Sequence, residues 1–303
     1  MKPTISICIP TFNRKEFLLE CLQSITFQFK NKTIMKKVEI IISDNASTDG
    51  TKKLVLKYKK KFNNIYYFRN NKNIGGIKNA IKAAKYAKGD YIWFFSDDDR
   101  QKDKAIDYAL KIISKFKPDA LYINLDLTSK DCKKIIDPNV FRADKDSFVT
   151  DRRSLFVFLE RKFFLPIDWY LTCLSCMLIK CSIFHKESKN FPSFNDNKYL
   201  FPHSSLIYYS DKDRTLYLSS KRLILFRSDN RSFGHVDKLK FLTDWYHALN
   251  THYEMIYQVN SQYMSIKFKI LFKFKIFLRV IRLSLITYFK IDISTILMKL
   301  FYR

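Results

Sequence analysis

Short apolar runs alternate with segments of helical periodicity through the first half of the chain. The apolar runs are Ile5–Ile9, Val38–Ile42, Ile65–Phe68, Tyr91–Phe95 and Ala120–Leu127. Between them, apolar residues recur three or four positions apart, as on the predicted helix face of Phe17, Leu18, Cys21, Leu22 and Ile25. Strands that alternate with helices at this spacing predict an α/β fold, with a mostly parallel sheet flanked by helices.

Polar loops follow the first four predicted strands. These loops contain Thr11–Arg14, Asp44–Asn45, Asn70–Gly76 and Asp97–Asp99. Ligands of open parallel sheets bind outside the carboxyl ends of the strands, where such loops meet. The pattern therefore predicts a site for a polar, phosphorylated ligand. Three more strand-like runs come later, at Cys176–Lys180, Thr215–Ser219 and Leu223–Phe226.

Three adjacent carboxylates, Asp97, Asp98 and Asp99, come directly after a buried strand. Like charges this close repel one another, and a divalent cation with its phosphates is the simplest compensation. The alternative is a solvated acidic turn that caps the next helix, predicted at about Asp103–Phe116. A capping turn needs only one Asp, so the triplet favours a metal.

Composition restricts the function classes further. The chain has 303 residues, 47% of them hydrophobic and 16% aromatic, which excludes a disordered protein. Its net charge of +26 suits nucleic acid, an anionic membrane or a phosphorylated substrate, although an AT-rich genome also produces lysine-rich chains. The basic residues are spread widely without a nucleic-acid recognition motif, so no nucleic acid is expected as a partner.

Targeting and cysteine signals are weak. The opening MKPTISICIP lacks the apolar core of a signal peptide, and no uncharged apolar run reaches 18 residues. We therefore expect a cytoplasmic location without a spanning helix.

Cys173 and Cys176 have CxxC spacing, but no second pair accompanies them, so a structural role is expected.

Four motifs in order resemble the inverting, family-two-type glycosyltransferases that have the A-type fold. The motifs are IPTFNR, SDNASTDGT, NKNIGGIKNA and GDYIWFFSDDD. The resemblance is good from Ser6 to Arg100 and looser to about Arg231. It implies a nucleotide-sugar donor, a glycan or lipid-linked acceptor and a role in bacterial surface polysaccharide assembly. It also implies a catalytic domain over 1–235, with a nucleotide-sugar-binding half (1–127) and an acceptor half (128–235).

The resemblance also implies roles for individual residues. Donor binding is expected from Pro10, Thr11, Asn13, Arg14, Asp44, Asn73, Gly75, Gly76, Lys78, Asp97 and Asp98. Asp99 and Asp97 are the expected ligands of Mn²⁺ or Mg²⁺, because an all-oxygen site suits these ions. Asp44 would bind the base, unless it only forms a polar turn before a helix. Arg14 and Lys78 would meet phosphate, unless they are solvated surface residues.

The general base has two candidates, because the acidic pair of related enzymes is missing. His203 lies where the family's catalytic Asp would fall, and a neutral imidazole can accept a proton near pH 7. His203 could equally cap its own helix. Asp196 is the second candidate, while Asp211 and Asp213 are more distant possibilities.

The C-terminal residues 236–303 are predicted to form a helical, basic, amphipathic extension. Nine Lys or Arg residues and one acid, Asp292, lie between Ser261 and Arg303, interspersed with Phe, Leu and Ile. Such a segment can lie on the anionic inner face of the cell membrane, which predicts peripheral association. Alternatively, it packs on the catalytic domain.

Two other functions fit parts of this pattern. A nucleotidyltransferase of similar fold would transfer the nucleotide itself, but such enzymes carry a Gly- and Arg-rich first loop that IPTFNR lacks. A basic membrane-binding or nucleic-acid-binding protein without catalysis would explain the charge but not the acidic triplet.

Overall fold

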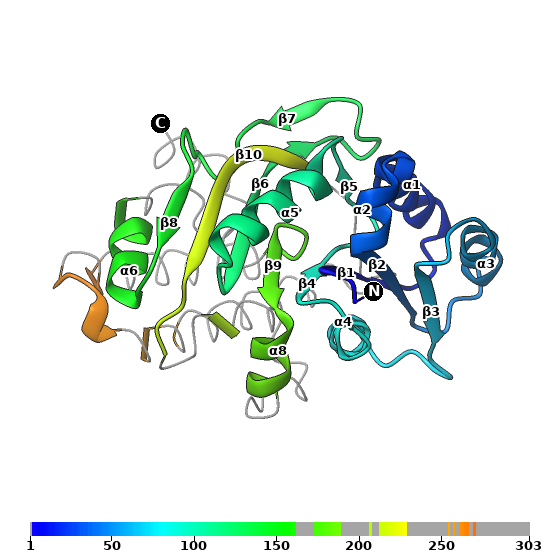
Figure 1. Cartoon of the computed structure of the whole chain (residues 1–303), viewed down its shortest axis with the longest axis horizontal. Helices are drawn as coiled ribbons and strands as arrows, with labels where there is room; N and C mark the ends of the chain where they lie inside the picture. The colour runs from blue at the N-terminus through cyan, green and yellow to red at the C-terminus, as the bar shows by residue number, and fades with distance from the viewer. Residues whose placement is uncertain are drawn as a thin grey trace, which may run out of the picture.

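The computed structural model describes residues 2–161, 173–188, 206–207 and 212–228, together with 254, 257–258, 261–266 and 269–270. In these residues, ten strands form one sheet with helices on both of its faces (Figure 1). This arrangement confirms the predicted α/β class with a mostly parallel sheet. Most of the predicted C-terminal extension lies outside the described residues, and the domain boundary at 235 stays a prediction.

The first half of the sheet is parallel and has the strand order β3-β2-β1-β4. The strands are β1 (Ile5–Thr11), β2 (Val38–Asp44), β3 (Ile65–Arg69) and β4 (Tyr91–Phe94). Their registers align Thr11 with Asp44 and Asp44 with Arg69. Each strand therefore ends at the same edge of the sheet, as the loop pattern predicted.

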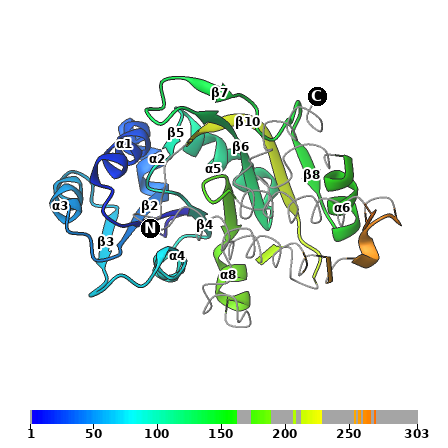
Figure 2. The same ribbon diagram turned by 180° about the vertical axis from the view of Figure 1, so that it is seen from behind.

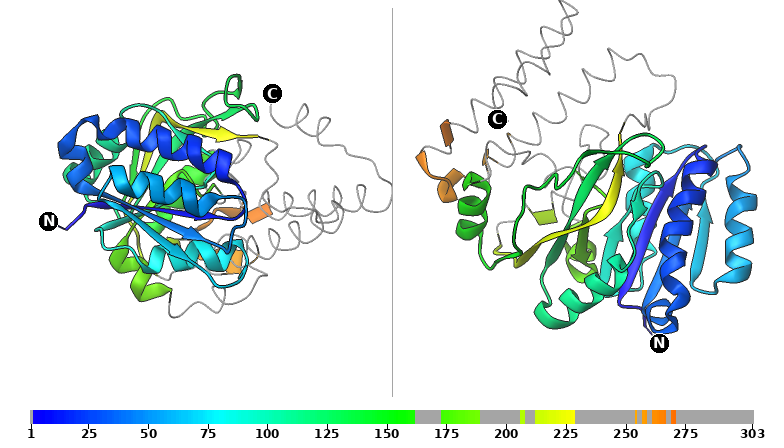
Figure 3. Two further views of the ribbon diagram at one scale, coloured as in Figure 1. Left: turned by 90° about the vertical axis from the view of Figure 1, so that its right-hand side faces the viewer. Right: turned by 90° about the horizontal axis from the view of Figure 1, so that it is seen from above.

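Helices cover both faces of this parallel half. They are α1 (Lys15–Thr26), α2 (Lys32–Lys37), α3 (Thr51–Lys61) and α4 (Gly76–Lys85), with the short helix η1 (Phe27–Lys30) after α1. Across the sheet, the chain proceeds from β1 through β2 to β3 in one direction. It then crosses back over these strands to β4, which lies on the other side of β1. Right-handed crossovers therefore place α1 and α3 on one face and α4 on the other (Figure 3).

The second half of the sheet is mixed. It contains β5 (Arg100–Gln101), β6 (Ala120–Thr128), β7 (Ile135–Asp137), β8 (Ser147–Val149), β9 (Met177–Lys180) and β10 (Leu216–Arg227). The helices of this part are α5 (Ala105–Phe116), α6 (Arg152–Arg161) and α8 (Cys181–Glu187). Strand β9 inserts antiparallel between β4 and β6, and α8 then lies on the same side of the sheet as α4 (Figures 1 and 2).

The prediction of two short strands at Thr215–Ser219 and Leu223–Phe226 is wrong. The structure has one strand, β10, which pairs parallel with β6. Register shifts between Leu218 and Ile224 accommodate the polar residues that separate the two runs. A polar stretch inside a strand looks like a break in the sequence, whereas a β-bulge lets the pairing resume beyond it.

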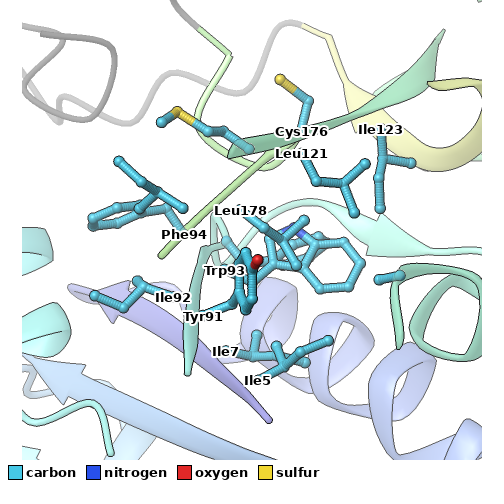
Figure 4. Close-up of a cluster of buried hydrophobic side chains, with 14 of the residues drawn as sticks. Ile5, Ile7, Tyr91, Ile92, Trp93, Phe94, Leu121, Ile123, Cys176 and Leu178 are labelled. Carbon is cyan, nitrogen blue, oxygen red and sulfur yellow. The ribbon is translucent and has the colours of Figure 1, made fainter. Parts of the chain in front are cut away.

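Side chains from β1, β4, β6 and β9 meet in one apolar core (Figure 4). Trp93 of β4 is fully buried, and its indole N–H donates a hydrogen bond to the carbonyl of Ser175 at 2.8 Å. This bond satisfies the one polar atom of the largest fully buried side chain among the described residues. It also fixes the segment before β9 beside the end of β4, where the acidic triplet begins.

Asp146 ties α5 to β10 and offers a test of stability against pH. Its carboxylate accepts hydrogen bonds from the hydroxyls of Tyr108, Tyr217 and Ser220 and from the Ser220 N–H. Burial alone would raise the pKa of Asp146, but these bonds outweigh it and lower the pKa. The stabilisation that ionised Asp146 provides is therefore complete above its unfolded-state pKa of about 4. It is lost as the pH falls through the lower pKa that Asp146 has in the folded protein.

We expect Asp146→Asn to lower the free energy of unfolding by about 1 kcal/mol at pH 7, since the site is partly solvated. Urea denaturation from pH 7 to pH 3 measures the effect, and the gap from the unaltered protein should narrow below about pH 4. If the difference in the free energy of unfolding between the two proteins stays constant from pH 7 to pH 3, ionised Asp146 does not stabilise the fold.

Among the described residues, no helix combines the length and the apolar character needed to cross a bilayer.

Candidate active site

The loops after β1, β2 and β3 are joined by hydrogen bonds through Asn45. Its N–H donates to the carbonyl of Thr11 at 2.9 Å, and its side-chain amide donates to Asn73 at 2.6 Å. Its side-chain oxygen accepts from the N–H of Ile74 and the amide of Asn70. Three loops that are distant in sequence therefore form one polar platform at the carboxyl edge of the sheet.

Asp44 is fully buried beneath this platform. Its carboxylate accepts from the N–H of Ser47 at 2.8 Å and from the hydroxyl of Tyr67 at 2.5 Å, and Arg69 lies 3.5 Å away. The N-cap residue of helix α3 is Gly50, and Asp49 before it accepts from the N–H and the hydroxyl of Thr51, the first helical residue. Asp44 is therefore not needed as the helix cap.

The glycine motif begins helix α4 with an open approach. Gly75 adopts a φ of 87°, a region that side chains other than glycine rarely occupy. A Cβ added at Gly76 would meet no atom within 4 Å, so the backbone there faces open space. Lys78 is exposed on α4, and within the described residues no hydrogen bond or ion pair joins its side chain to the other predicted site residues.

The acidic triplet is buried, which the solvated-turn alternative did not predict. Asp97, Asp98 and Asp99 are 3%, 7% and 1% exposed. The guanidinium of Arg14 lies 2.9 Å from the carboxylate of Asp97 and 2.5 Å from that of Asp98. The hydroxyl of Ser96 donates to Asp98 as well. Arg14 is thus a member of the site and not a solvated surface residue.

Burial raises the pKa values of the outer two carboxyl groups of the triplet. For Asp97, burial outweighs the opposing effect of Arg14, and the neighbouring Asp98 raises the pKa further. For Asp99, burial and then Asp98 raise the pKa well above its usual range. Without a cation the fold therefore favours the protonated forms of Asp97 and Asp99, whereas a bound cation would favour their ionised forms.

Asp99 is tied to two segments far away in sequence. One carboxylate oxygen accepts from the hydroxyl of Ser175 at 2.5 Å, and the other accepts from the N–H of Arg227 at 3.1 Å. The hydroxyl of Ser175 also accepts from the N–H of Ser96. Ser175 was not among the predicted site residues, since its only signal in the sequence is its place in the CxxC segment just before a predicted strand.

Arg227, at the end of β10, is almost fully buried. Its guanidinium donates to the carbonyl of Asp98 at 2.8 Å, to the carbonyl of Lys130 and to the carboxylate of Glu20 at 2.5 Å. It also lies over the ring of Phe17, 4.9 Å from the ring centre. Arg227 therefore links the acidic triplet to α1 and to the second half of the sheet.

The triplet has one feature that fits a divalent metal. Among the described residues, the Oδ2 atom of Asp97 is buried without a hydrogen-bond partner. No group of three or more His, Cys, Asp or Glu side chains in the same part of the chain is arranged to hold a metal ion. Mg²⁺ and related ions commonly use one or two carboxylates and complete their shell with phosphates and water. Asp97 suits this arrangement better than Asp99, because both oxygens of Asp99 are engaged.

Of the four candidates for the general base, the structure describes one, Asp213. His203, Asp196 and Asp211 lie outside the described residues. Asp213 is described, and its carboxylate accepts from the N–H of Arg152 at the start of α6, 3.0 Å away. Asp213 is therefore positioned as a helix cap.

Comparison with known proteins decides the family. The model of Glycosyl transferase family 2 matches residues 6–187, which is more than half of the chain. The chain belongs to glycosyl transferase family 2. This confirms the resemblance inferred from the four motifs, and the protein is a glycosyltransferase of the kind that uses nucleotide sugars.

Family 2 relatives include transferases of bacterial polysaccharide assembly. The chain is 34% identical over 252 residues to abequosyltransferase RfbV of Salmonella typhimurium, which covers 78% of this chain and 70% of that protein. It is 37% identical over 98 residues to the GalNAc(5)-diNAcBac-PP-undecaprenol beta-1,3-glucosyltransferase of Campylobacter jejuni, covering 32% of this chain and 30% of that one.

Solved structures share the fold of this family 2 chain. Residues 1–349 of Staphylococcus aureus TarS in complex with UDP-GlcNAc match with a TM-score of 0.62 and 19% identity, over 84% of this chain and 66% of that one. The mannosyltransferase PcManGT of Pyrobaculum calidifontis, in complex with GDP-Man and Mn²⁺, matches with a TM-score of 0.54 and 15% identity, over 84% and 64%. The chain thus spans just under two thirds of these structures.

Proposed function

We propose that this protein moves a sugar, with inversion, from a nucleotide-sugar donor to a glycan or glycolipid acceptor in bacterial surface polysaccharide or lipooligosaccharide assembly. The observation that carries the proposal is the meeting of three joined polar loops with a fourth loop that carries the buried acidic triplet, at the carboxyl edge of one sheet. The similarity to an abequosyltransferase over most of the chain supports the reaction class.

The donor would lie across the joined loops. Asp44 would accept a hydrogen bond from the base, because a carboxylate oxygen has lone pairs beyond those used by Ser47 and Tyr67. Since Asp44 is fully buried, the half-exposed side chain of Arg69 beside it would have to move aside. Pro10, Thr11 and Asn13 would border the nucleoside, and the open backbone at Gly75 and Gly76 would let it approach the start of α4. Asn73 and Lys78 would contact the donor from the same loop and helix.

The diphosphate would lie beside the triplet. Asp97 would provide an oxygen ligand to Mn²⁺ or Mg²⁺ and Asp99 would support it, while Asp98 would face the ribose or the sugar. When bound, the metal would act as a Lewis acid that stabilises charge on the leaving diphosphate. Arg14 would exchange a carboxylate partner for a donor phosphate, because the guanidinium fork fits both.

The attacking hydroxyl needs a base on the acceptor side. His203 would accept this proton, with Asp196 as the second candidate, and both are residues of the predicted acceptor half. Replacement of either residue should lower turnover and leave donor binding intact.

The C-terminal segment would hold the enzyme on the inner face of the cell membrane. Ile266 and Ile270 are 77% and 63% exposed and lie four positions apart, a spacing that places side chains on one helix face. An apolar face among lysines suits an anionic bilayer surface. Such a location would bring the enzyme to a lipid-linked acceptor.

A panel of nucleotide sugars tests the donor proposal. One nucleotide diphosphate sugar should raise the melting temperature by about 4 °C at a hundredfold excess over its dissociation constant, since binding to the folded state then adds about 2.7 kcal/mol. The shift should shrink when EDTA replaces Mn²⁺, and the same sugar should be transferred or hydrolysed. Absence of any shift with every nucleotide diphosphate and sugar tested would refute the proposal.

A further inference from the structure

A hollow of about 740 Å³ opens at the amino-terminal edge of the sheet. It lies at the starts of β1 and β4 and the ends of β9 and α5, whereas the joined polar loops lie at the opposite edge. In the left view of Figure 3, β1 runs from the end marked N across the molecule, so the hollow lies on the N side. The length of a seven-residue strand, roughly 20 Å, separates the two edges.

Lysines from separate segments surround this hollow. Lys2 comes from the N-terminus, Lys37 from the end of α2, Lys88 from the turn before β4, Lys117 from the end of α5 and Lys180 from the end of β9. No two of these lysines are close in sequence, so the fold itself collects them. The volume matches that of ordinary small-molecule sites.

Two of the five lysines are compensated by carboxylates. Lys2 pairs with Asp90 at 2.6 Å, and Lys180 pairs with Asp119 at 2.8 Å. Lys37, Lys88 and Lys117 have no ion pair with a carboxylate in the part of the chain that the structure describes. All three side chains are exposed at the rim, so their ammonium groups can turn toward a ligand. For Lys88 this means leaving the ring of Tyr66, over which its ammonium group lies 5.7 Å from the ring centre.

The wall of the hollow has an apolar part that is firmly held. Tyr91, Leu110 and Ile113 form this part. The polar lining comes from Asp90, Ser114, Ser182 and His185. The hydroxyl of Tyr91 donates to the carbonyl of Pro118 at 2.7 Å, which fixes the turn that carries Lys117. Low-polarity walls strengthen the field of nearby charges, so three ammonium groups around one hollow attract multivalent anions.

We propose that this hollow is a second anion site, separate from the donor site, that binds clustered phosphate groups through Lys37, Lys88 and Lys117. The ligand class is a diphosphate or a set of adjacent phosphate groups, because the three uncompensated charges surround a single space. These groups can come from a soluble diphosphate or from the headgroups of an anionic bilayer. The proposal does not depend on the nature of the sugar donor.

The test uses the full chain and a triple variant, Lys37→Gln, Lys88→Gln and Lys117→Gln. A matched control removes the same charge from an exposed face of α3 through Lys52→Gln, Lys53→Gln and Lys57→Gln. Inorganic pyrophosphate is titrated by calorimetry in EDTA, which suppresses the metal-dependent donor site. Vesicles of phosphatidylglycerol and phosphatidylcholine are tested by co-sedimentation in parallel.

The triple variant should lose at least tenfold in affinity in one of the two assays, whereas the control should stay within twofold of the unaltered protein. Selective loss with pyrophosphate identifies a soluble diphosphate as the ligand source, and selective loss only with vesicles identifies lipid headgroups. Both variants should retain the unaltered melting temperature within a few degrees and the same sugar transfer. Equal loss in the two variants, or no selective loss in either assay, overturns the proposal.

Discussion

Asp97→Asn should reduce sugar transfer by about a thousandfold while leaving the fold intact. The variant loses the buried carboxylate oxygen that has no partner within the described residues and that we assign to the metal. A metal contributes several kcal/mol of stabilisation to developing charge, and about 4 kcal/mol corresponds to a factor of about a thousand in rate. The measurement is transfer from the identified donor at saturating Mn²⁺.

Stability should move in the opposite direction from activity. Burial raises the pKa of Asp97, so at neutral pH the ionised carboxyl group destabilises the folded state relative to the unfolded chain. A neutral amide removes that penalty, and the melting temperature of Asp97→Asn in EDTA should be equal to or above that of the unaltered protein. An unchanged or higher melting temperature together with lost transfer would show that Asp97→Asn impairs function and not folding.

Asp103→Asn is the matched control for this variant. Asp103 is exposed, lies four positions after Asp99, and accepts a hydrogen bond from the N–H of its neighbour Lys104. Its replacement should change transfer by less than about twofold, since isolated surface charges contribute little. Transfer by Asp97→Asn within tenfold of the unaltered rate would contradict the role assigned to Asp97.

Arg227→Met should lower the free energy of unfolding by about 3 kcal/mol. The change removes the guanidinium that donates to the carbonyls of Asp98 and Lys130 and to the carboxylate of Glu20. Loss of one partner from a buried charged network costs about 3–5 kcal/mol, and the partial exposure of Glu20 puts the value at the lower end. Urea denaturation measures the difference.

Two further variants sharpen this result. Arg227→Lys should recover little stability, because a single ammonium group cannot reproduce the planar fork that joins three acceptors. Arg222 lies on the same strand, and its half-exposed guanidinium is 3.5 Å from Asp126. Arg222→Met should therefore lower the free energy of unfolding by less than about 1 kcal/mol. Similar losses in Arg222→Met and Arg227→Met would mean that the link to the triplet does not stabilise the fold.

The main strands and helices, and the edge at which the polar loops meet, were predictable because their signals are local. Four residues of the predicted face of α1 (Leu18, Cys21, Leu22 and Ile25) are buried, since helical periodicity reports directly on which side meets the sheet. The polar loops met at one edge, because parallel strands end together. The four motifs identified the family before any contact was known.

Partners across long stretches of chain were decided only by the tertiary structure. Ser175 and Arg227 reach Asp99 from 76 and 128 residues away, and β9 inserts between strands whose own sequences do not specify it as a neighbour. Tertiary packing also brings Arg14 to the triplet. It likewise gathers the lysines around the hollow at the opposite edge of the sheet. A sequence pattern reveals which side of an element is buried, but which residues face one another depends on strand order and register, and these are fixed by packing of the whole sheet.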